Sequence, residues 1–437
     1  MSKREYQWES IDNPPIIKAH SLNKHVVTIA YLNRYLEKLY QASRTYIRLS
    51  IIDGFAGGGI YKTEKGELEY GSPIKIMRAV REAESVLAEK YQKKLDIRAR
   101  YYFVEQDKKA VKVLHEVLEQ QELVPFDDDL SRIIRGNVLD HWSTITQSVK
   151  SEGKTHRALF ILDQYGYKDV PIFYIQNLFK ELPHAEIILT FAVDWLIDYL
   201  SDKPDYLQRC QNRLCVLGIE TTLEEIVHIK KTTPAGRLII QDILSEELSK
   251  NCGARYFTRY FIRTAGKSHH DSHRDLWLIH MSQHDIARDE MVKVHWGEAN
   301  HLSLHAGFQG IDDHGWGRLG YSTRLDEKLG QINLDYTFDR QKNYADSKAI
   351  LLSQIPDIMW KFSEKGPFTF AMLMAEIANY SPASSDLIKD VIHYLLDAKD
   401  VSISCAKTGK KRQKGSTIKF TDVITVIHKG LFFGNLK

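Results

Sequence analysis

The chain has 437 residues, of which 43% are hydrophobic and 27% are charged, and its formal net charge is +3. This composition is that of a folded protein, and the length predicts two or three domains. A net charge this small does not by itself indicate nucleic acid, so any basic surface must be local.

Cysteine content and the first residues exclude other classes of protein. The four cysteines form no C-x-x-C pair and are too few for a disulfide framework in a chain of this length. The opening stretch MSKREYQWESIDNPP has no apolar core of the kind a signal peptide carries, and no run approaches 18 apolar residues. We therefore expect a cytoplasmic protein without a membrane span.

The first 200 residues alternate between helical and strand patterns. The first helix is predicted over 22–42 from apolar residues spaced three and four apart, which are Val26, Ile29, Leu32, Leu36 and Leu39. The next predicted elements are a strand at 46–55, a helix at 72–93 capped by Ser72, a strand at 98–107, a helix at 108–121, strands at 130–140 and 158–167, a helix at 173–183 and a strand opening 185–200. The strands read as continuous hydrophobic runs. This α/β pattern predicts a mostly parallel, doubly wound, Rossmann-like sheet with helices on both faces.

The remaining chain contains an insertion, a sheet edge and a second folded region. Residues 200–250 are polar and helical, and strands at 255–264 and 274–284 are expected to complete the sheet. From 346 onward the pattern changes to three helices and then two strands around a basic loop, which is the outline of a winged helix. The expected domains are a Rossmann-like domain at 1–296, a linker or irregular lobe at 297–345 and a winged-helix domain at 346–437.

The run IIDGFAGGGIY at 51–61 places a carboxylate and three consecutive glycines after the first strand. Without a Cβ, glycine lets the backbone turn sharply and lie close to a ligand. The first strand-to-helix turn of a doubly wound sheet is where a cofactor binds. The spacing D-x-F-x-G-x-G fits the form that S-adenosylmethionine enzymes use around the methionine part of the cofactor. The candidate cofactor-binding residues of this turn are Asp53, Phe55, Ala56, Gly57 and Gly59.

Polar residues also follow the next three predicted strands. Glu105, followed by Gln106, ends the second strand, where a carboxylate can accept both ribose hydroxyls. Asn137 and Val138 follow the third strand, at the usual position beside the adenine, and Asp163 follows the fourth. Carboxylates often simply cap strand ends. Four polar groups in register nevertheless favour S-adenosylmethionine as the cofactor.

Five segments of the chain together resemble the three-Cys-motif partner proteins, over about residues 20–200. These segments are LNKHVVTIAYLNRYL, IIDGFAGGGIY, YGSPIKIM, YFVEQDKKAVKVL and FILDQYGYKDVPI. The resemblance implies a class I methyltransferase-like domain, often with a winged-helix module behind it. It also implies a radical-SAM-like partner protein.

The chain departs from that family in the loop after the fourth strand. The family usually has D-P-[YF]-G, and this chain has Asp163, Gln164, Tyr165 and Gly166. In amino-methyltransferases the acid or amide accepts hydrogen bonds from the target amine, and the aromatic ring stacks on a flipped base. The resemblance therefore implies that Asp163, Tyr165 and Gly166 form the catalytic loop, with Gln164 in place of the rigid proline.

A histidine-rich stretch, SHHDSHRDLWLIHMSQH, raises the question of a metal site. Its candidate ligands are His269, His270, Asp271, His273, His280 and His284. Imidazole and carboxylate groups bind zinc or manganese, which would indicate a nuclease or another hydrolase. The spacing matches no metal motif, so we predict polar loop histidines and no metal.

The carboxyl-terminal stretch KTGKKRQKGSTIKF is strongly basic. Its candidate nucleic-acid-binding residues are Lys407, Lys410, Lys411, Arg412 and Lys414. On a winged helix these residues would form the wing and contact phosphates, while 380–396 would supply the recognition helix. The alternative is a hairpin that lysines merely keep soluble.

These observations predict an S-adenosylmethionine-dependent methyltransferase-like protein that acts on or binds DNA or RNA, either alone or with a partner enzyme. Two alternatives remain open. The Rossmann-like domain could have lost catalysis and serve as a nucleic-acid-binding or scaffold subunit. The histidine stretch could instead form the metal centre of a nuclease.

Overall fold

The structure is a computed structural model, and its chain forms two compact units, Met1–Val294 and His295–Lys437. Each unit is described by itself. The residues that the structure describes are 6–42, 45–123, 131–153, 155–164, 169–233, 236–264, 274–297, 340–379, 381, 383–413 and 415–427.

A seven-stranded sheet forms the centre of the first unit, in the order β5–β4–β1–β6–β7–β9–β8. The strands in this order are β5 (Ser131–Arg135), β4 (Asp96–Glu105), β1 (Tyr46–Asp53), β6 (Arg157–Leu162), β7 (Ala185–Phe191), β9 (Arg274–Ser282) and β8 (Tyr256–Thr264). The first five run parallel, and β9 pairs antiparallel with both β7 and β8. The predicted mostly parallel, doubly wound sheet is confirmed. The chain reverses its direction of travel across the sheet between β1 and β6, where such folds bind ligands.

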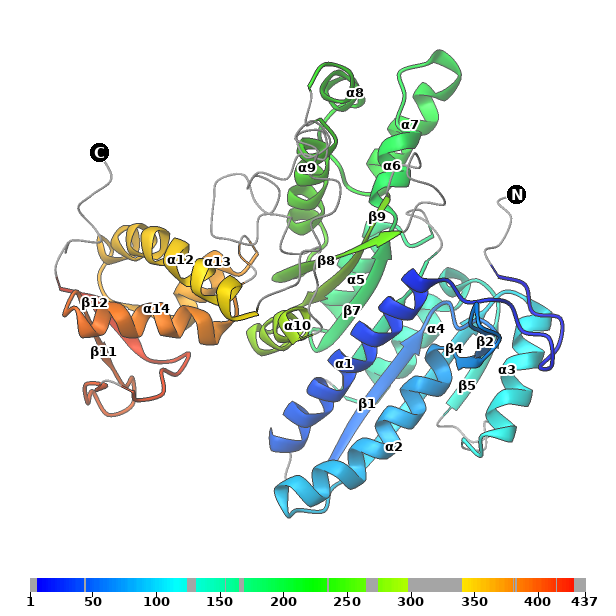
Figure 1. Cartoon of the computed structure of the whole chain (residues 1–437), viewed down its shortest axis with the longest axis horizontal. Coiled ribbons are helices and arrows are strands. Elements are labelled where there is room, and N and C mark those ends of the chain that lie inside the picture. Colours follow the sequence, from blue (N-terminus) through cyan, green and yellow to red (C-terminus); the bar gives the residue numbers. More distant parts are fainter. Residues whose placement is uncertain are drawn as a thin grey trace. The chain divides into compact units, whose positions relative to one another are not determined.

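Helices cover both faces of this sheet (Figure 1). The helices on one face are α1 (Ala19–Ala42), α2 (Ser72–Tyr91) and α3 (Lys108–Gln120), and those on the other are α4 (Val138–Ser151) and α5 (Ile172–Glu181). Leu32 and Leu36 of α1 are fully buried in the core of the first face. Each contributes about 1.5–3 kcal/mol by leaving water. On the second face the ring of Trp142 lies 5.5 Å from that of Phe160.

The apolar face predicted for α1 is confirmed at Leu32, Leu36 and Leu39, which are buried, and fails at its first residue. Val26 is 49% exposed, whereas Val27, Tyr31 and Tyr35 are buried. The Tyr31 hydroxyl donates to the buried Glu186 carboxylate, whereas the buried Tyr35 hydroxyl has no hydrogen-bond partner among the described residues. The buried face of α1 is therefore wider than the spacing of aliphatic residues alone predicted, because tyrosine buries a large ring.

The start of α2 also differs from the prediction, although Pro73 lies in its first turn as expected. The capping residue is Gly71, which has no side-chain hydrogen bond. The Ser72 hydroxyl instead donates to an Asp53 carboxylate oxygen at 2.6 Å. The beginning of α2 is therefore tied to the end of β1.

The described residues ahead of α1, 6–18, form an amino-terminal strap across the turn that follows β1. Backbone hydrogen bonds join the Ile17 nitrogen to the Lys62 oxygen at 2.8 Å and the Lys62 nitrogen to the Pro15 oxygen at 2.9 Å. Lys62 ends β2 (Ile60–Lys62), which pairs with β3 (Leu68–Tyr70) in a small hairpin that the sequence did not predict. The strap places Trp8 over the glycines, and the indole nitrogen donates to the Ile60 oxygen at 2.8 Å.

Additional helices follow β7 in the predicted insertion and beyond it. They are α6 (Val193–Tyr199), α7 (Pro204–Val216), α8 (Leu223–Thr232), α9 (Gly236–Asn251) and, after β9, α10 (Asp285–Gly297). Buried Asp194 joins α6 to α9, because its Oδ1 pairs with Arg237 at 2.9 Å and accepts from Gln241 at 2.9 Å. In the described parts of the chain no helix is long and apolar enough to cross a membrane.

The second unit contains three helices and a three-stranded antiparallel sheet of order β10–β12–β11. Its elements are α12 (Arg340–Ser363), β10 (Phe368–Thr369), α13 (Phe370–Ile377), α14 (Ser385–Asp397), β11 (Val401–Ser404) and β12 (Val423–Val426). The three helices and the hairpin that the sequence predicted are present, and the first helix begins at Arg340, ahead of its predicted start. Most of the expected irregular lobe, 298–339, lies outside the described residues.

The packing of the strap on the turn can be tested at Gly58, where an added Cβ would lie 2.4 Å from the Trp8 ring. We expect Gly58→Ala to lower the free energy of unfolding by about 1–3 kcal/mol through overpacking. In a Trp8→Ala background the same change should cost almost nothing, because the clashing ring is gone. Urea unfolding of both single variants and the double variant measures this coupling. If the losses in free energy of unfolding of the two single variants simply add up in the double variant, the contact between Gly58 and Trp8 is contradicted.

Candidate cofactor and substrate site

The predicted site residues at the strand ends gather at one edge of the sheet. Asp53, Glu105 and Asp163 lie at or just after the carboxyl ends of β1, β4 and β6, and Asn137 follows β5. These four strands are neighbours in the sheet, in the order β5–β4–β1–β6. The Gly57 nitrogen donates to Glu105 Oε2 at 3.0 Å, which joins the turn after β1 directly to the end of β4.

The turn after β1 is fixed by hydrogen bonds from its own backbone. The Phe55 nitrogen donates to Asp53 Oδ1 at 3.1 Å, and the Ala56 nitrogen donates to the Val104 oxygen at 2.9 Å. Gly57 has a φ of +62°, in the left-handed region that favours glycine. The backbone of the turn therefore has one defined path between β1 and β4.

Protein side chains already occupy the space that the missing Cβ atoms of the glycines leave. A Cβ on Gly59 would lie 2.7 Å from Leu114 and 2.8 Å from Ile74, which belong to α3 and α2. A Cβ on Gly57 or Gly58 would meet the Trp8 ring at 2.9 Å or less. The glycines are thus needed for close packing of two helices and the strap, a role that the sequence interpretation did not foresee.

Asp53 is fully buried, with no exposed surface, at the centre of these contacts. Its two oxygens accept hydrogen bonds from the Phe55 nitrogen and the Ser72 hydroxyl. Burial raises the pKa of the Asp53 carboxyl to about 7, although both hydrogen bonds favour the ionised form. Asp53 therefore changes its charge in the neutral range.

Glu105 and the residues after β5 keep polar groups toward the same edge. Glu105 Oε1 accepts from the Asp107 nitrogen at 2.7 Å, so with the Gly57 bond both carboxylate oxygens are held in place, and Gln106 beside it is exposed. Asn137 caps α4, because its Oδ1 accepts from the Leu139 nitrogen at 2.9 Å. Its side-chain nitrogen makes no hydrogen bond to a described residue. Val138 is buried and packs close to the Cα of Gly54.

Asp163 is held by two groups that the sequence interpretation missed, Lys24 of α1 and Thr190 of β7. Lys24 Nζ and Thr190 Oγ1 each lie 2.6 Å from Asp163 Oδ1. Burial of Asp163 opposes ionisation, but the charge of Lys24 and the two hydrogen bonds outweigh it and lower the pKa of Asp163. Asp163 is therefore a carboxylate at neutral pH, and no described group donates to its Oδ2.

A cavity of about 20 Å³ lies beside this pair, and Lys24, Asp163, Thr190, Ser72 and His25 help to line it. A space of this size holds about one water molecule. Burial lowers the pKa of His25 to about 3, so its ring is neutral. The Nδ1 atom of His25 is buried without a hydrogen-bond partner among the described residues.

Gln164, which stands in place of the family's proline, is 3% exposed and fixes the loop in another way. Its Oε1 accepts hydrogen bonds from the Asp169 nitrogen at 3.0 Å and the Val170 nitrogen at 3.1 Å. A side-chain amide thus joins Gln164 to the backbone of Asp169 and Val170, on the far side of this loop. Tyr165 and Gly166 lie outside the described residues.

The described histidines of the predicted loop lie in two different pairs. His280 is buried, and its Nε2 lies 3.2 Å from a Glu186 oxygen. His284 Nε2 lies 2.9 Å from His184 Nδ1. His269, His270, Asp271 and His273 lie outside the described residues. Within the part of the chain that is described, no three His, Cys, Asp or Glu side chains come together to hold a metal ion.

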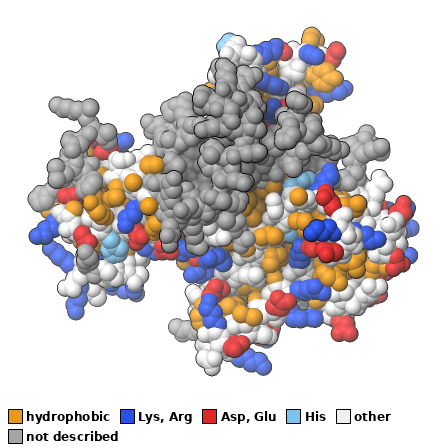
Figure 2. Space-filling model, in the orientation of Figure 1, with side chains coloured by type: hydrophobic (Ala, Val, Ile, Leu, Met, Phe, Trp, Pro, Cys, Tyr) orange, Lys and Arg blue, Asp and Glu red, His pale blue; other side chains and the backbone are white. Residues whose placement is uncertain are grey.

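The predicted nucleic-acid-binding residues lie on the hairpin between β11 and β12. In Figure 2, Lys and Arg side chains lie along the side of the second unit where Figure 1 shows this hairpin. Lys407, Lys410 and Lys411 are exposed. Arg412 instead pairs with the buried Asp422 through two hydrogen bonds of 2.9 Å, so its guanidinium holds the hairpin together. Lys414 lies outside the described residues.

The helix predicted to read nucleic acid, α14, has an acidic outward side. Asp386 and Asp397 are exposed and Asp390 is half-buried, against a single lysine, Lys389. Lys389 in turn lies 3.2 Å from Asp386. This side of α14 therefore lacks the positive charge that phosphate contacts need.

Comparison with known proteins found no matching family model and no matching curated protein. Three of the similar solved structures are a Legionella pneumophila protein, LPL1258, a Streptococcus mutans protein, SMU.1697c, in complex with SAH, and an rRNA methylase from Streptococcus thermophilus. Their identities are 10%, 12% and 8%, and their TM-scores are 0.34, 0.25 and 0.23. The alignments cover 60%, 61% and 57% of this chain and 85%, 99% and 94% of the other chains. Likenesses this remote carry no argument, and the inferences below rest on the chain's own geometry.

The raised pKa of Asp53 predicts that stability falls as pH rises. The Asp53 carboxyl binds its proton more tightly in the folded chain than in the unfolded chain. The stabilisation that protonated Asp53 gives the folded chain is therefore fully present below about pH 4 and is lost as pH rises through about 7. Relative to Asp53→Asn, the wild-type free energy of unfolding should drop by about 2.5 kcal/mol between pH 5 and pH 8. Urea unfolding at both pH values measures the difference. An unchanged difference would show that Asp53 does not titrate in this range.

Proposed function

We propose that the chain is an S-adenosylmethionine-dependent methyltransferase-like protein that acts on nucleic acid. The observation that carries the proposal is the gathering of Asp53, Glu105, Asn137 and Asp163 at the carboxyl ends of four neighbouring strands. The sheet order supports it, because a parallel sheet that ends in an antiparallel pair, here β9 and β8, is the arrangement of class I methyltransferases.

The residues at this edge fit an adenosyl cofactor. Glu105 is held by two backbone N–H groups at this edge, and a carboxylate in this position can accept both ribose hydroxyls. The side-chain nitrogen of Asn137, which makes no hydrogen bond to a described residue, could donate to an acceptor nitrogen of the adenine ring. Asp53 and the glycine turn would border the methionine part of the cofactor. When bound, S-adenosylmethionine supplies an electrophilic methyl group.

Asp163 is the residue we assign to the substrate. Lys24 and Thr190 occupy its Oδ1 and keep it ionised, so Oδ2 is free to accept a hydrogen bond from an exocyclic amine. In the resembling family loop an aromatic residue stacks on the base, which assigns that role to Tyr165 and leaves Gly166 as the loop's last member. The rate gain then comes mainly from aligning the amine with the methyl group.

The hairpin of the second unit supplies the contact with nucleic acid in this proposal. Lys407, Lys410 and Lys411 are exposed, and we assign the unit to the winged-helix class with this hairpin as its wing, an assignment that its three helices and three-stranded sheet support. Phosphate contacts of this kind position a strand but do not select a sequence. We also infer from the three-Cys-motif resemblance that a radical-SAM-like protein is a partner.

A non-catalytic scaffold is the second candidate function, and one observation favours it. The space beside Gly57, Gly58 and Gly59, where their Cβ atoms would lie, is filled by Trp8, Leu114 and Ile74. A domain that has lost its cofactor could close its turn in this way. Cofactor binding decides between the two functions.

Calorimetric titration of S-adenosylmethionine into the full chain tests the cofactor site. We expect saturable binding that Glu105→Gln weakens at least tenfold, because a charged acceptor is worth about 1.5–3 kcal/mol. The matched control is Glu64→Gln, which removes an exposed carboxylate outside the site. No saturable binding at millimolar ligand would overturn the cofactor assignment. Binding without transfer of a labelled methyl group to DNA or RNA would favour the scaffold.

The basic hairpin predicts salt-dependent binding of nucleic acid. We expect Lys407→Gln, Lys410→Gln and Lys411→Gln together to weaken binding and to reduce the slope of log K against log salt by up to about 3, since each phosphate that a lysine neutralises adds roughly one unit. The control is the same change at Lys361, Lys365 and Lys399, which are exposed in the same unit. Fluorescence anisotropy with a labelled oligonucleotide measures both. Equally weakened binding in the two triple variants would show that net charge alone is responsible.

A further inference from the structure

The opposite end of the sheet carries an arginine surface that the proposed function does not use. The first residues of β1 and β4 alternate between exposed and buried side chains, so one face of these strand ends is open to solvent. This alternation corrects the expectation of continuously buried strands. Arg48 of β1 and Arg98 of β4 are direct partners in the parallel ladder, and Arg100 follows Arg98 on the same face.

Neighbouring like charges on a sheet are unfavourable, so the partners of each arginine matter. Arg98 pairs with Asp96 at 2.6 Å, and Arg100 pairs with Glu152 at 2.7 Å. Arg48 pairs with no carboxylate among the described residues, and its guanidinium lies 4.8 Å from the centre of the Tyr46 ring. One guanidinium in this cluster is therefore available to an anion.

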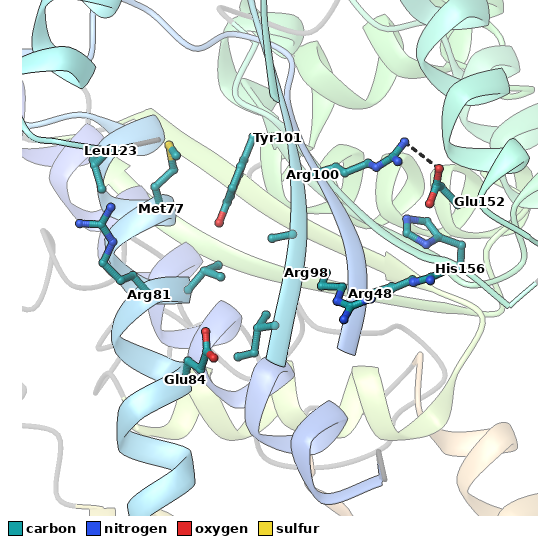
Figure 3. Close-up of a pocket in the computed structure, with 13 residues that line it drawn as sticks. Arg48, Met77, Arg81, Glu84, Arg98, Arg100, Tyr101, Leu123, Glu152 and His156 are labelled. Carbon is teal, nitrogen blue, oxygen red and sulfur yellow. Dashed lines mark ion pairs between the residues drawn. The ribbon is translucent and has the colours of Figure 1, made fainter. Parts of the chain in front are cut away.

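These arginines line a cavity of about 570 Å³, a volume typical of small-molecule sites. Figure 3 shows that the cavity extends around β4: Arg48, Arg100, Glu152 and His156 lie on one side of the strand, and Met77, Arg81 and Tyr101 lie on the other. The charged lining residues are Arg48, Arg81, Arg98, Arg100, Glu84 and Glu152. Four of these side chains are positive and two are negative, and Asp96 outside the lining pairs with Arg98, so one positive charge remains in excess and favours an anionic ligand.

His156 does not change this balance at neutral pH. It is 8% exposed, and its Nε2 lies 2.9 Å from the Ser50 hydroxyl. Burial lowers the pKa of His156, and the nearby Arg100 and Arg48 lower it further against the opposing charge of Glu152. The ring is therefore neutral, and the positive charge of the cavity comes from the arginines.

We propose that this cavity binds a phosphate group joined to a planar ring, which is the chemistry of a nucleotide, either free or at the end of a strand. The planar guanidinium of Arg48 matches phosphate oxygens, and Arg98 and Arg100 add charge beside it. On the other side of β4, Met77, Leu123 and Tyr101 offer an apolar wall for the ring. Arg98 lies about 23 Å from Glu105 along β4, since seven strand residues at roughly 3.3 Å each separate them. The cavity is thus distinct from the candidate cofactor site.

Calorimetric titration of the full chain with AMP, adenosine, inorganic phosphate and a 5′-phosphorylated oligonucleotide tests the proposal. We expect Arg48→Gln to weaken AMP binding at least tenfold. Glu152→Gln, which frees Arg100, should strengthen it about threefold or more. Arg209→Gln, an exposed arginine on α7, should change nothing.

Several outcomes would overturn the assignment. AMP binding that survives Arg48→Gln, or that Arg209→Gln weakens equally, would remove the cavity as the site. Loss of AMP binding in Glu105→Gln would place the nucleotide in the candidate cofactor site instead. Equal affinity for AMP and inorganic phosphate would show that the apolar wall does not bind the ring of the nucleotide. If the proposal holds, tighter binding of the oligonucleotide than of AMP, still sensitive to Arg48→Gln, identifies a strand end as the source.

Discussion

Lys24 and Asp163 lie 139 residues apart in the chain, and the ion pair between them, at 2.6 Å, joins α1 to the end of β6. A lysine with 9% of its side chain exposed carries a large desolvation cost unless a carboxylate faces it. The pair therefore fixes how α1 is rotated on the sheet. It also keeps Asp163 ionised and places His25 beside the same cavity. The geometry of the proposed substrate site depends on this one interaction.

The turn after β1 shows how a ligand-binding motif also serves the packing of the fold. Its glycines let α2, α3 and the amino-terminal strap come close, and its acid, Asp53, anchors the first residue of α2. Trp8 of the strap packs on Gly57 and Gly58, so the strap supports the turn that is proposed to bind the cofactor, although the sequence interpretation assigned it no role.

The two units use positive charge differently. In the second unit, buried Asp422 binds Arg412 and so holds the hairpin that exposes three lysines. In the first unit, Arg48 and Arg98 at the start of β1 and β4 are exposed on a strand face whose alternate residues are buried. A chain with a net charge of only +3 can therefore present basic surfaces, provided that they are local.

The sequence alone determined the parallel sheet, its helices and the identity of the strand-end residues, because hydrophobic periodicity and strand-end chemistry are local signals. It missed the part of the buried face of α1 that Tyr31 forms and misassigned the cap of α2, since both depend on distant partners, Glu186 and Asp53. Only the tertiary structure brought Lys24, His25 and Thr190 to Asp163 and gave Arg412 a buried partner. Contacts between segments far apart in the chain leave no periodic pattern in the sequence, and the cost of burying charge selects them only when the chain is folded.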